Sequence, residues 1–314
     1  MTYKRRRIAT LDLGTNSLLM VVAERNEEGQ VTVLEEDGLL PRLGEGLRNS
    51  GKISPQAADR ACADLRNFFS RARNLQADEI VVTATSAVRE ASNRDEFLSR
   101  VKEELDLEIE VLPPNEEARL AYISVTLERG HDDPSMVVDI GGGSTEITWG
   151  IGARFDGGRS LDLGTVKLLD GPLASERPST SDLEKARKEI DSRLMRVTPL
   201  GKLDHYYGTA GSFTHLASVD LKLTEYHPDR VQGYRLDKET VSDWTSKLAS
   251  MSVEEKLALP GIDPKRVDVI FPGTLIIERL FEKFGHDAFE VHDRGIRFGK
   301  LFDRLRTFVP PVRF

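Results

Sequence analysis

The stretch Leu11-Asp12-Leu13-Gly14-Thr15-Asn16-Ser17 decides the fold, because a second stretch of the same form, VDIGGGST at residues 138–145, opens the second half of the chain. Each copy has an apolar residue, an aspartate, another apolar residue and a glycine, followed by small polar residues. In both copies an apolar run precedes the turn and another follows it, as in two successive strands. The repeat therefore predicts an internal duplication.

Apolar runs, caps and turns continue this pattern outward from both copies. In the first half we expect strands at 8–13, 18–23 and 31–34, followed by a helix that starts at Pro55 after the N-cap Ser54. We then expect a strand at 80–84, a polar turn holding Arg89 and Asn93, and a helix ending near Leu105. A strand at 109–112 and a helix at 115–129 complete this half. In the second half we expect strands at 136–140 and 145–149, a helix at 181–197, a strand ending at Gly208, helices around Trp244, Leu257 and Ile276, and a last helix at 295–306. Residues 130–134 break the pattern, which predicts two α/β domains, 1–130 and 131–314.

Composition limits the classes of function. The chain has 314 residues, a net charge of −8 and one cysteine, Cys62. This charge disfavours a large nucleic-acid surface, and a single cysteine allows no disulfide framework. No segment has transmembrane length and no signal-peptide pattern is present, so we expect a cytoplasmic protein with no nucleic-acid or membrane partner. A polyanionic substrate would need a local basic groove, for which the candidates are Arg42, Arg48, Arg89 and Arg294.

The two repeated turns have the chemistry of phosphate sites. A strand that ends in aspartate, followed by a turn of glycine and serine or threonine, presents backbone N–H groups and hydroxyls to phosphate oxygens. A single aspartate before a glycine turn is usually only a turn. Two copies, each opening an α/β half, favour phosphate binding. The predicted phosphate-binding residues are Thr15, Asn16, Ser17, Gly142, Gly143, Ser144 and Thr145.

Further motifs give the chain a family resemblance. Together with RLGEG at 42–46, TSAVREASN at 85–93 and EEAR at 116–119, the two turns resemble the exopolyphosphatase and guanosine pentaphosphate phosphohydrolase (Ppx/GppA) family of the actin-like superfamily. The motifs occur in the family's order over essentially the whole chain. The resemblance implies the short two-domain form: two actin-like (ribonuclease H-like) domains related by duplication, with the active site in the interdomain cleft.

The same resemblance implies roles for single residues. Glu117 would be the general base that activates water, and Arg89 would bind phosphate oxygens. The metal would be Mg²⁺, with Asp139, Gly141, Glu146 and Asp12 as the implied metal residues; carboxylates suit this cation. Two alternatives remain open. Asp12 could instead brace the first loop through hydrogen bonds, and Glu117 could merely favour a helix N-terminus.

The expected activity is magnesium-dependent removal of the terminal phosphate from inorganic polyphosphate. Guanosine pentaphosphate 5′-phosphohydrolysis is the nearest alternative, and a non-catalytic phosphate or nucleotide sensor is a third. A kinase is disfavoured by the acidic pair at 116–117. Three departures from the family pattern bear on the substrate. Leu18 and Leu19 stand where a basic residue is usual, and Ala210 replaces a glycine of the 208–212 turn. The chain also ends at Phe314 without a C-terminal helical domain, so we expect shorter polyphosphate chains to be handled. A homodimer is a possible assembly.

Overall fold

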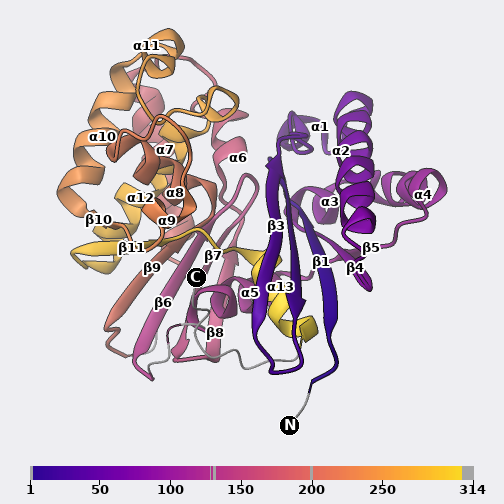
Figure 1. The fold of residues 1–314 in the computed structure, drawn as a ribbon. Coiled ribbons are helices and arrows are strands. Elements are labelled where there is room, and N and C mark those ends of the chain that lie inside the picture. The colour runs from indigo at the N-terminus through magenta and orange to yellow at the C-terminus, as the bar shows by residue number, and fades with distance from the viewer. Residues whose placement is uncertain (1–2, 128, 130–131, 199–200, 306–314) are drawn as a thin grey trace. The chain divides into compact units, whose positions relative to one another are not determined.

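The computed structural model describes residues 3–127, 129, 132–198 and 201–305. The chain divides into two compact units, each built around its own sheet (Figure 1). Unit 1 comprises residues 1–132, 152–155 and 294–314, and unit 2 comprises residues 133–151 and 156–293. No helix in the described part of the chain is long and apolar enough to cross a membrane.

Unit 1 contains a five-stranded mixed sheet. Its strands are β1 (Arg6–Leu13), β2 (Leu18–Arg25), β3 (Val31–Leu39), β4 (Glu79–Ala84) and β5 (Ile109–Val111). They lie in the order β3-β2-β1-β4-β5. The first three strands form an antiparallel meander, whereas β1, β4 and β5 run parallel. The tight β1–β2 connection is the first predicted phosphate loop.

Helices cover both faces of this sheet, and strand alternation decides which side chain meets which helix. The helices are α1 (Leu47–Ser50), α2 (Pro55–Asn74), α3 (Ser86–Glu90), α4 (Arg94–Leu105), α5 (Pro114–Thr126) and α13 (Ile296–Leu305). Leu11 and Leu13 of β1 pack with α2 and α4 in one core cluster. Ile8 packs with α13 in another. Asp12 therefore faces the same side of the sheet as Ile8, the side covered by α13.

The last helix differs from the predicted domain assignment. The sequence places residues 295–306 in the second domain, but α13 belongs to unit 1. Its apolar residues Phe298, Leu301, Phe302 and Leu305 pack against β1, β2 and β3. Burial of this stripe, rather than chain order, decides where the helix lies. Residue 306, its predicted end, lies outside the described residues, as do 130 and 131, where the domain boundary was predicted.

Unit 2 repeats the topology of unit 1. Its strands are β6 (Pro134–Ile140), β7 (Thr145–Ile151), β8 (Arg154–Leu161), β9 (His205–Thr209), β10 (Arg235–Asp237) and β11 (Ala288–His292). Within the order β10-β11-β9-β6-β7-β8, the run β8-β7-β6-β9-β11 matches β3-β2-β1-β4-β5 of unit 1. β6 and β7 pair antiparallel, and β6, β9 and β11 run parallel. The predicted duplication and the actin-like α/β fold class are confirmed.

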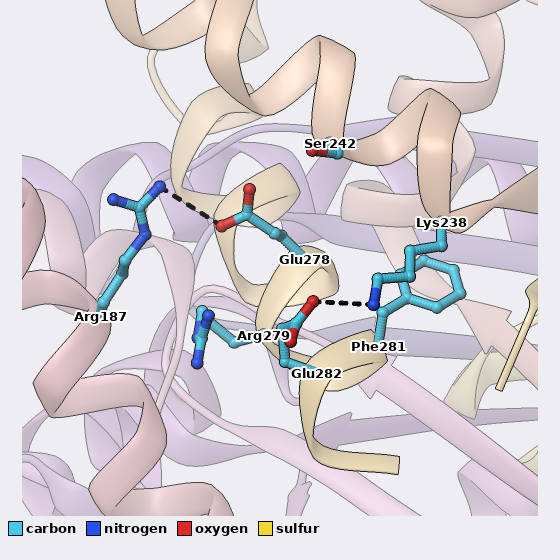
Figure 2. Close-up of a pocket in the computed structure, with 7 residues that line it drawn as sticks. All are labelled: Arg187, Lys238, Ser242, Glu278, Arg279, Phe281 and Glu282. Atoms are coloured by element: carbon cyan, nitrogen blue, oxygen red, sulfur yellow. Dashed lines mark hydrogen bonds and ion pairs between the residues drawn. The ribbon is translucent and has the colours of Figure 1, made fainter. Parts of the chain in front are cut away.

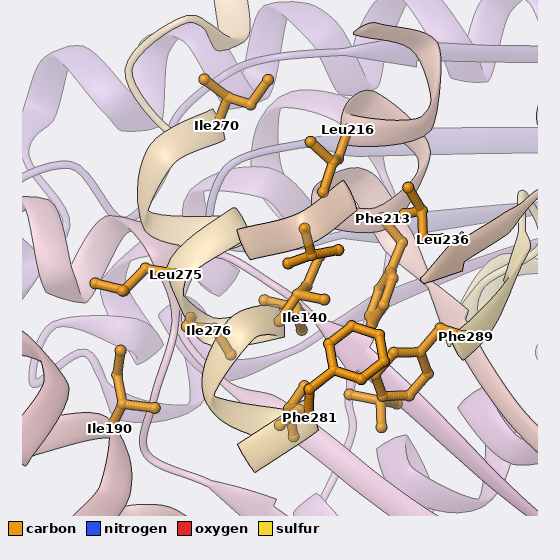
Figure 3. Close-up of a cluster of buried hydrophobic side chains, with 14 of the residues drawn as sticks. Ile140, Ile190, Phe213, Leu216, Leu236, Ile270, Leu275, Ile276, Phe281 and Phe289 are labelled. Atoms are coloured by element: carbon orange, nitrogen blue, oxygen red, sulfur yellow. The ribbon is translucent and has the colours of Figure 1, made fainter. Parts of the chain in front are cut away.

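The helices of unit 2 enclose its main core. They are α6 (Thr165–Leu169), α7 (Thr180–Leu194), α8 (Ala210–Asp220), α9 (Pro228–Val231), α10 (Lys238–Ser250), α11 (Val253–Leu257), the 3₁₀ helix η1 (Pro264–Arg266) and α12 (Ile270–Phe284). Figure 3 shows Ile276 of α12 next to Ile140 of β6, whereas Leu275 of α12 lies on the side of Ile190 of α7. Because Ile140 faces this core, Asp139 faces the opposite side of the sheet.

Candidate functional site

The first loop, residues 14–17, is a closed turn between β1 and β2. The N–H of Gly14 donates to the carbonyl of Ser17 at 2.8 Å. Thr15 and Asn16 are buried at 6% and 7% exposure. The side-chain oxygen Asn16 Oδ1 is buried and has no hydrogen-bond partner among the described residues. A buried acceptor of this kind marks a place where a ligand group or water completes the site.

Asp12 lies at the end of β1, beside this loop. It is in register with Thr83 of β4, whose hydroxyl donates to Asp12 Oδ1 at 3.4 Å. Burial, and after it the charge of Glu117, raise the pKa of Asp12 to about 7, against the opposing effects of Arg297 and the Thr83 hydroxyl. The carboxyl is therefore costly to ionise without a cation nearby.

Glu117 lies in the first turn of α5 and is 2% exposed. Its Oε2 accepts a hydrogen bond from Arg89 Nη1 at 2.7 Å, and the same nitrogen donates to the carbonyl of Leu112 at 2.9 Å. Asp12 faces the side of the sheet that α13 covers, and α13 packs against α5, so Asp12 and Glu117 lie on the same face of unit 1. The charge of Glu117 accordingly raises the pKa of Asp12. Arg89, predicted to bind phosphate, thus also orients the predicted base. The predicted polar turn around it is in fact helix α3, with Arg89 in its last turn.

The second loop, residues 141–144, connects β6 and β7 and repeats the first. The N–H of Gly141 donates to the carbonyl of Ser144 at 2.9 Å, the same closure that Gly14 and Ser17 make. The hydroxyl of Thr145 donates to the carbonyl of Leu163 at 2.7 Å. Thr145, predicted to bind phosphate, therefore uses its hydroxyl proton to hold the chain that follows β8.

Two acidic side chains flank the second loop. Asp139 of β6 and Glu146 of β7 are directly opposite each other across the antiparallel pair. They are 5% and 1% exposed and lie on the face opposite the main core. Ser160 of β8 donates to Glu146 Oε1 at 2.7 Å. Like charges at opposed positions repel, so this pair favours a bound cation.

The acidic residues at the second loop suit Mg²⁺, and they do not form a site that encloses a metal with protein ligands alone. Among the described residues, no group of three or more histidine, cysteine, aspartate or glutamate side chains could hold a metal ion. Mg²⁺ is commonly bound by one or two carboxylates and completed by water and substrate phosphates. Asp139 and Glu146 meet that requirement. The carbonyl of Gly141 accepts from the N–H of Thr165 at 3.1 Å, so this predicted ligand has a protein partner.

The candidate basic residues have different environments. Arg48 is exposed and Arg42 is half-buried. Arg294 is 8% exposed, its guanidinium lies over the ring of Phe298 at 5.0 Å, and burial lowers its pKa to about 10. Arg294 is therefore part of the interior of unit 1. The basic groove itself stays a prediction.

A separate cavity of about 280 Å³ lies among helices α7, α10 and α12 of unit 2 (Figure 2). Its charged side chains are paired: Arg187 with Glu278 at 3.5 Å, and Lys238 with Glu282 at 2.9 Å. None of the predicted site residues lines it. A cavity whose charges already neutralise one another offers little to a polyanion, so the candidate site residues are those at the loop of each unit.

Sequence reasoning missed the residues that support the site. Thr83, Ser160 and the chain around Gly164 belong to no motif that was singled out. One signal was available: LDLGT at 161–165 is identical to residues 11–15. The fold and the loops together define a duplicated α/β protein in which buried carboxylates adjoin two glycine turns.

Comparison with known proteins places the chain in a family. A model of the Ppx/GppA phosphatase family matches residues 21–308, and the chain belongs to this family. It is 29% identical to exopolyphosphatase 2 of Mycobacterium tuberculosis over 312 residues, covering 93% of this chain and 97% of that protein. It is 28% identical to exopolyphosphatase 1 of Mycobacterium leprae, covering 95% and 89%. The crystal structure of the Aquifex aeolicus Ppx/GppA family member superimposes with a TM-score of 0.82 at 27% identity, covering 96% and 98%. The resemblance stated from the motifs is confirmed, and the protein is a phosphoanhydride hydrolase.

Proposed function

We propose that this protein is a magnesium-dependent exopolyphosphatase that removes the terminal phosphate of inorganic polyphosphate by hydrolysis. The observation that carries the proposal is the buried Glu117, held by Arg89 at 2.7 Å on the same face of unit 1 as Asp12. A buried carboxylate fixed in this way is suited to orient a water molecule and accept its proton. The relatives named exopolyphosphatase support the choice of substrate.

Each group has a role in this reaction. Phosphoryl transfer needs positioning and charge neutralisation more than covalent chemistry from the protein. Glu117 orients water and takes its proton, and Arg89 holds the Glu117 carboxylate. The backbone amides of the two loops bind phosphate oxygens. Bound Mg²⁺, held by Asp139 and Glu146, would offset the negative charge of the phosphates.

Guanosine pentaphosphate remains the second candidate substrate, because one arrangement of loops and carboxylates can serve both phosphoanhydrides. The apolar Leu18 and Leu19 after the first loop remove a basic contact that family members usually have. A sensor without turnover is disfavoured by the retained Glu117, Asp139 and Glu146. The cytoplasmic location and a homodimer stay predictions.

Phosphate release tests the proposal. Purified protein is incubated with polyphosphates of several lengths and with guanosine pentaphosphate, each with Mg²⁺ and with a chelator. We expect release from polyphosphate in Mg²⁺ and none in the chelator. Preferential hydrolysis of guanosine pentaphosphate would support the second candidate. Binding without turnover of any of these substrates would support the sensor, and full activity in the chelator would refute the metal requirement.

A further inference from the structure

In each unit, a short segment that follows the third strand of the meander donates backbone hydrogen bonds to the phosphate loop; we call this segment the brace. In unit 1 this brace is residues 42–44, which follow β3, and in unit 2 it is residues 163–166, which follow β8. Both contain Leu-Gly, with the leucine buried at 0% in Leu43 and 1% in Leu163. A brace of this kind thus occurs in both halves of the duplication, and the backbone of neither has a role in the function described so far.

The braces donate hydrogen bonds to loop carbonyls. The N–H of Gly44 donates to the carbonyl of Thr15 at 2.8 Å, and the N–H of Arg42 donates to that of Asn16 at 3.0 Å. In unit 2, the N–H of Val166 donates to the carbonyl of Gly142 at 2.9 Å. When the repeats are aligned on Asp12 and Asp139, Thr15 and Gly142 are equivalent. The same carbonyl is therefore held in both loops.

This bond fixes the direction of the next amide. In a planar trans peptide, the carbonyl of one residue and the N–H of the following residue point in opposite directions. Because the carbonyls of Thr15 and Gly142 point at the braces, the N–H groups of Asn16 and Gly143 point away from them. Neither N–H has a hydrogen-bond partner among the described residues. Two amides at equivalent positions are thus held ready for an anion.

Only glycine lets the braces come this close. A Cβ on Gly164 would lie 2.6 Å from the backbone nitrogen of Gly143 and closer still to the carbonyl of Gly142. A Cβ on Gly44 would collide with the Cγ2 of Thr15. Arg42 has φ of 52°, a left-handed conformation that is rare outside glycine. Strain at this position indicates that the brace is held in place at a cost.

We propose that Gly44 and Gly164 are both positioning residues, each allowing a brace to aim a loop amide, Asn16 N–H or Gly143 N–H, at a phosphate oxygen of the substrate. Gly44 donates the bracing hydrogen bond itself, whereas Gly164 leaves room for the bond that Val166 donates. The part of this inference that concerns the substrate rests on the proposed function. The orientation of the amides rests on the hydrogen bonds alone. Methylenebisphosphonate, a phosphoanhydride analogue that cannot be hydrolysed, separates the two in the test.

The experiment measures binding of methylenebisphosphonate in the presence of Mg²⁺ by calorimetry and by backbone ¹⁵N–¹H spectra. In the wild type, the amide signals of Asn16 and Gly143 should shift on addition. Gly164→Ala should weaken binding on the order of 10- to 100-fold, as expected for a lost charge-assisted hydrogen bond. It should also remove the Gly143 shift. Gly157→Ala in β8 is the matched control, since its Cβ would make ordinary contacts of 3.4 Å with Trp149.

A second variant guards against misfolding of the first. Gly44→Ala should weaken binding, and adding Thr15→Ser should restore it to the level of Thr15→Ser alone, because serine lacks the colliding Cγ2. The analogue-induced shift of the Asn16 amide should disappear in Gly44→Ala and return in the double variant, a readout that a purely structural role would not move. Gly164→Ala binding like the wild type, or analogue binding that leaves both amides unshifted, would overturn the inference. Analogue binding with the expected shifts, but no hydrolysis of any polyphosphate, would refute the proposed function and leave the inference standing.

Discussion

Three candidate carboxylates, those of Glu117, Asp12 and Glu146, each receive a hydrogen bond from a side chain on another element. Arg89 donates to Glu117, Thr83 to Asp12, and Ser160 to Glu146. A buried carboxylate needs such donors, since loss of hydration without compensation is costly. Each donor also determines which of the two carboxylate oxygens accepts the hydrogen bond. Their removal should therefore alter chemistry before it alters folding.

The hydroxyl of Ser160 should tune the metal site. Ser160→Ala removes the donor to Glu146 Oε1, so we expect the Mg²⁺ concentration for half-maximal activity to rise on the order of 10-fold, as is typical when a partner of a metal ligand is lost. Calorimetric titration with Mn²⁺ checks the affinity without turnover. Thr148→Val is the control, because Thr148 lies on the neighbouring strand β7 but donates to the backbone carbonyl of Val137. Equal metal affinity in Ser160→Ala and the wild type would contradict the expectation.

The opposed carboxylates themselves should be indispensable. Asp139→Ala or Glu146→Ala removes one of the two oxygen donors, so we expect activity at ordinary Mg²⁺ to be lost. Raised Mg²⁺ should partly restore at least one variant, because the remaining carboxylate still attracts the cation. Phosphate release as a function of Mg²⁺ concentration provides the measurement. Wild-type metal dependence in both variants would place the metal elsewhere.

At the scale of elements, α13 supports the helix that carries Glu117. A Cβ on Gly299 would collide with the backbone carbonyl of Leu120 in α5, so the two helices are in close contact there. Arg119 of α5 also pairs with Asp303 of α13 at 2.9 Å. Small residues at a helix crossing permit this approach. The position of α5 therefore depends on α13.

Gly299→Ala should separate these helices. We expect the free energy of unfolding to fall by roughly 1–3 kcal/mol, as overpacking commonly does, and turnover to fall because Glu117 moves with α5. Urea unfolding and the turnover number provide the measurements. Arg304→Ala is the control on the same helix, since its ion pair with Glu79 at 3.5 Å is partly exposed and contributes little. Unchanged stability and turnover in Gly299→Ala would show that the contact does not constrain α5.

Elements with strong apolar periodicity were predictable from the sequence, whereas β8 was missed. The predicted helix behind Ser54 is α2, whose cap accepts from the N–H of Ala57 as expected. β8 contains Gly157 and Gly158, which lower strand propensity. Gly158 leaves room for Thr148 of the neighbouring strand. Such a strand depends on tertiary contacts, and so do Ser160 and the brace that follows it.

At the scale of the whole molecule, two buried histidines predict acid sensitivity. Burial lowers the pKa values of His215 and His286 to about 4 from the ordinary 6.5. His215 Nε2 accepts from the N–H of Asp263 at 3.0 Å, and His286 stacks on Tyr206 at 4.0 Å. Neither ring nitrogen of His286 has a hydrogen-bond partner among the described residues. Both imidazoles are thus neutral in the folded state.

The difference in proton binding between the unfolded and folded chains decides whether stability rises or falls with pH. Between pH 6.5 and 4 the unfolded chain binds protons that the folded chain does not, so stability falls as the pH falls through this window. Each histidine contributes up to about 3 kcal/mol of this loss. His286→Phe and His215→Gln should each flatten the dependence. Urea unfolding at pH 7 and pH 4.5 measures it, and a variant with the wild-type difference would exclude that histidine as a cause.

The duplication also explains how far the sequence could predict the site. Repeated turns predict two loops without knowledge of contacts, and the family motifs supply Glu117 and Arg89. The ion pair between those two residues joins α3 and α5, elements whose approach is set by packing in unit 1 rather than by any local pattern. The same holds for the opposed pair Asp139 and Glu146, which depends on strand register.

Glu117→Gln is the most direct test of the account, with Glu116→Gln as its internal control. The amide keeps the size of the carboxylate but cannot take a proton, so we expect phosphate release from polyphosphate to fall on the order of 10²-fold or more while binding is retained. Glu116 pairs with Arg119 at 2.7 Å and is partly exposed, so its variant should retain activity. Turnover and binding are measured separately on pure protein. Wild-type turnover in Glu117→Gln would contradict the assignment of Glu117 as the base.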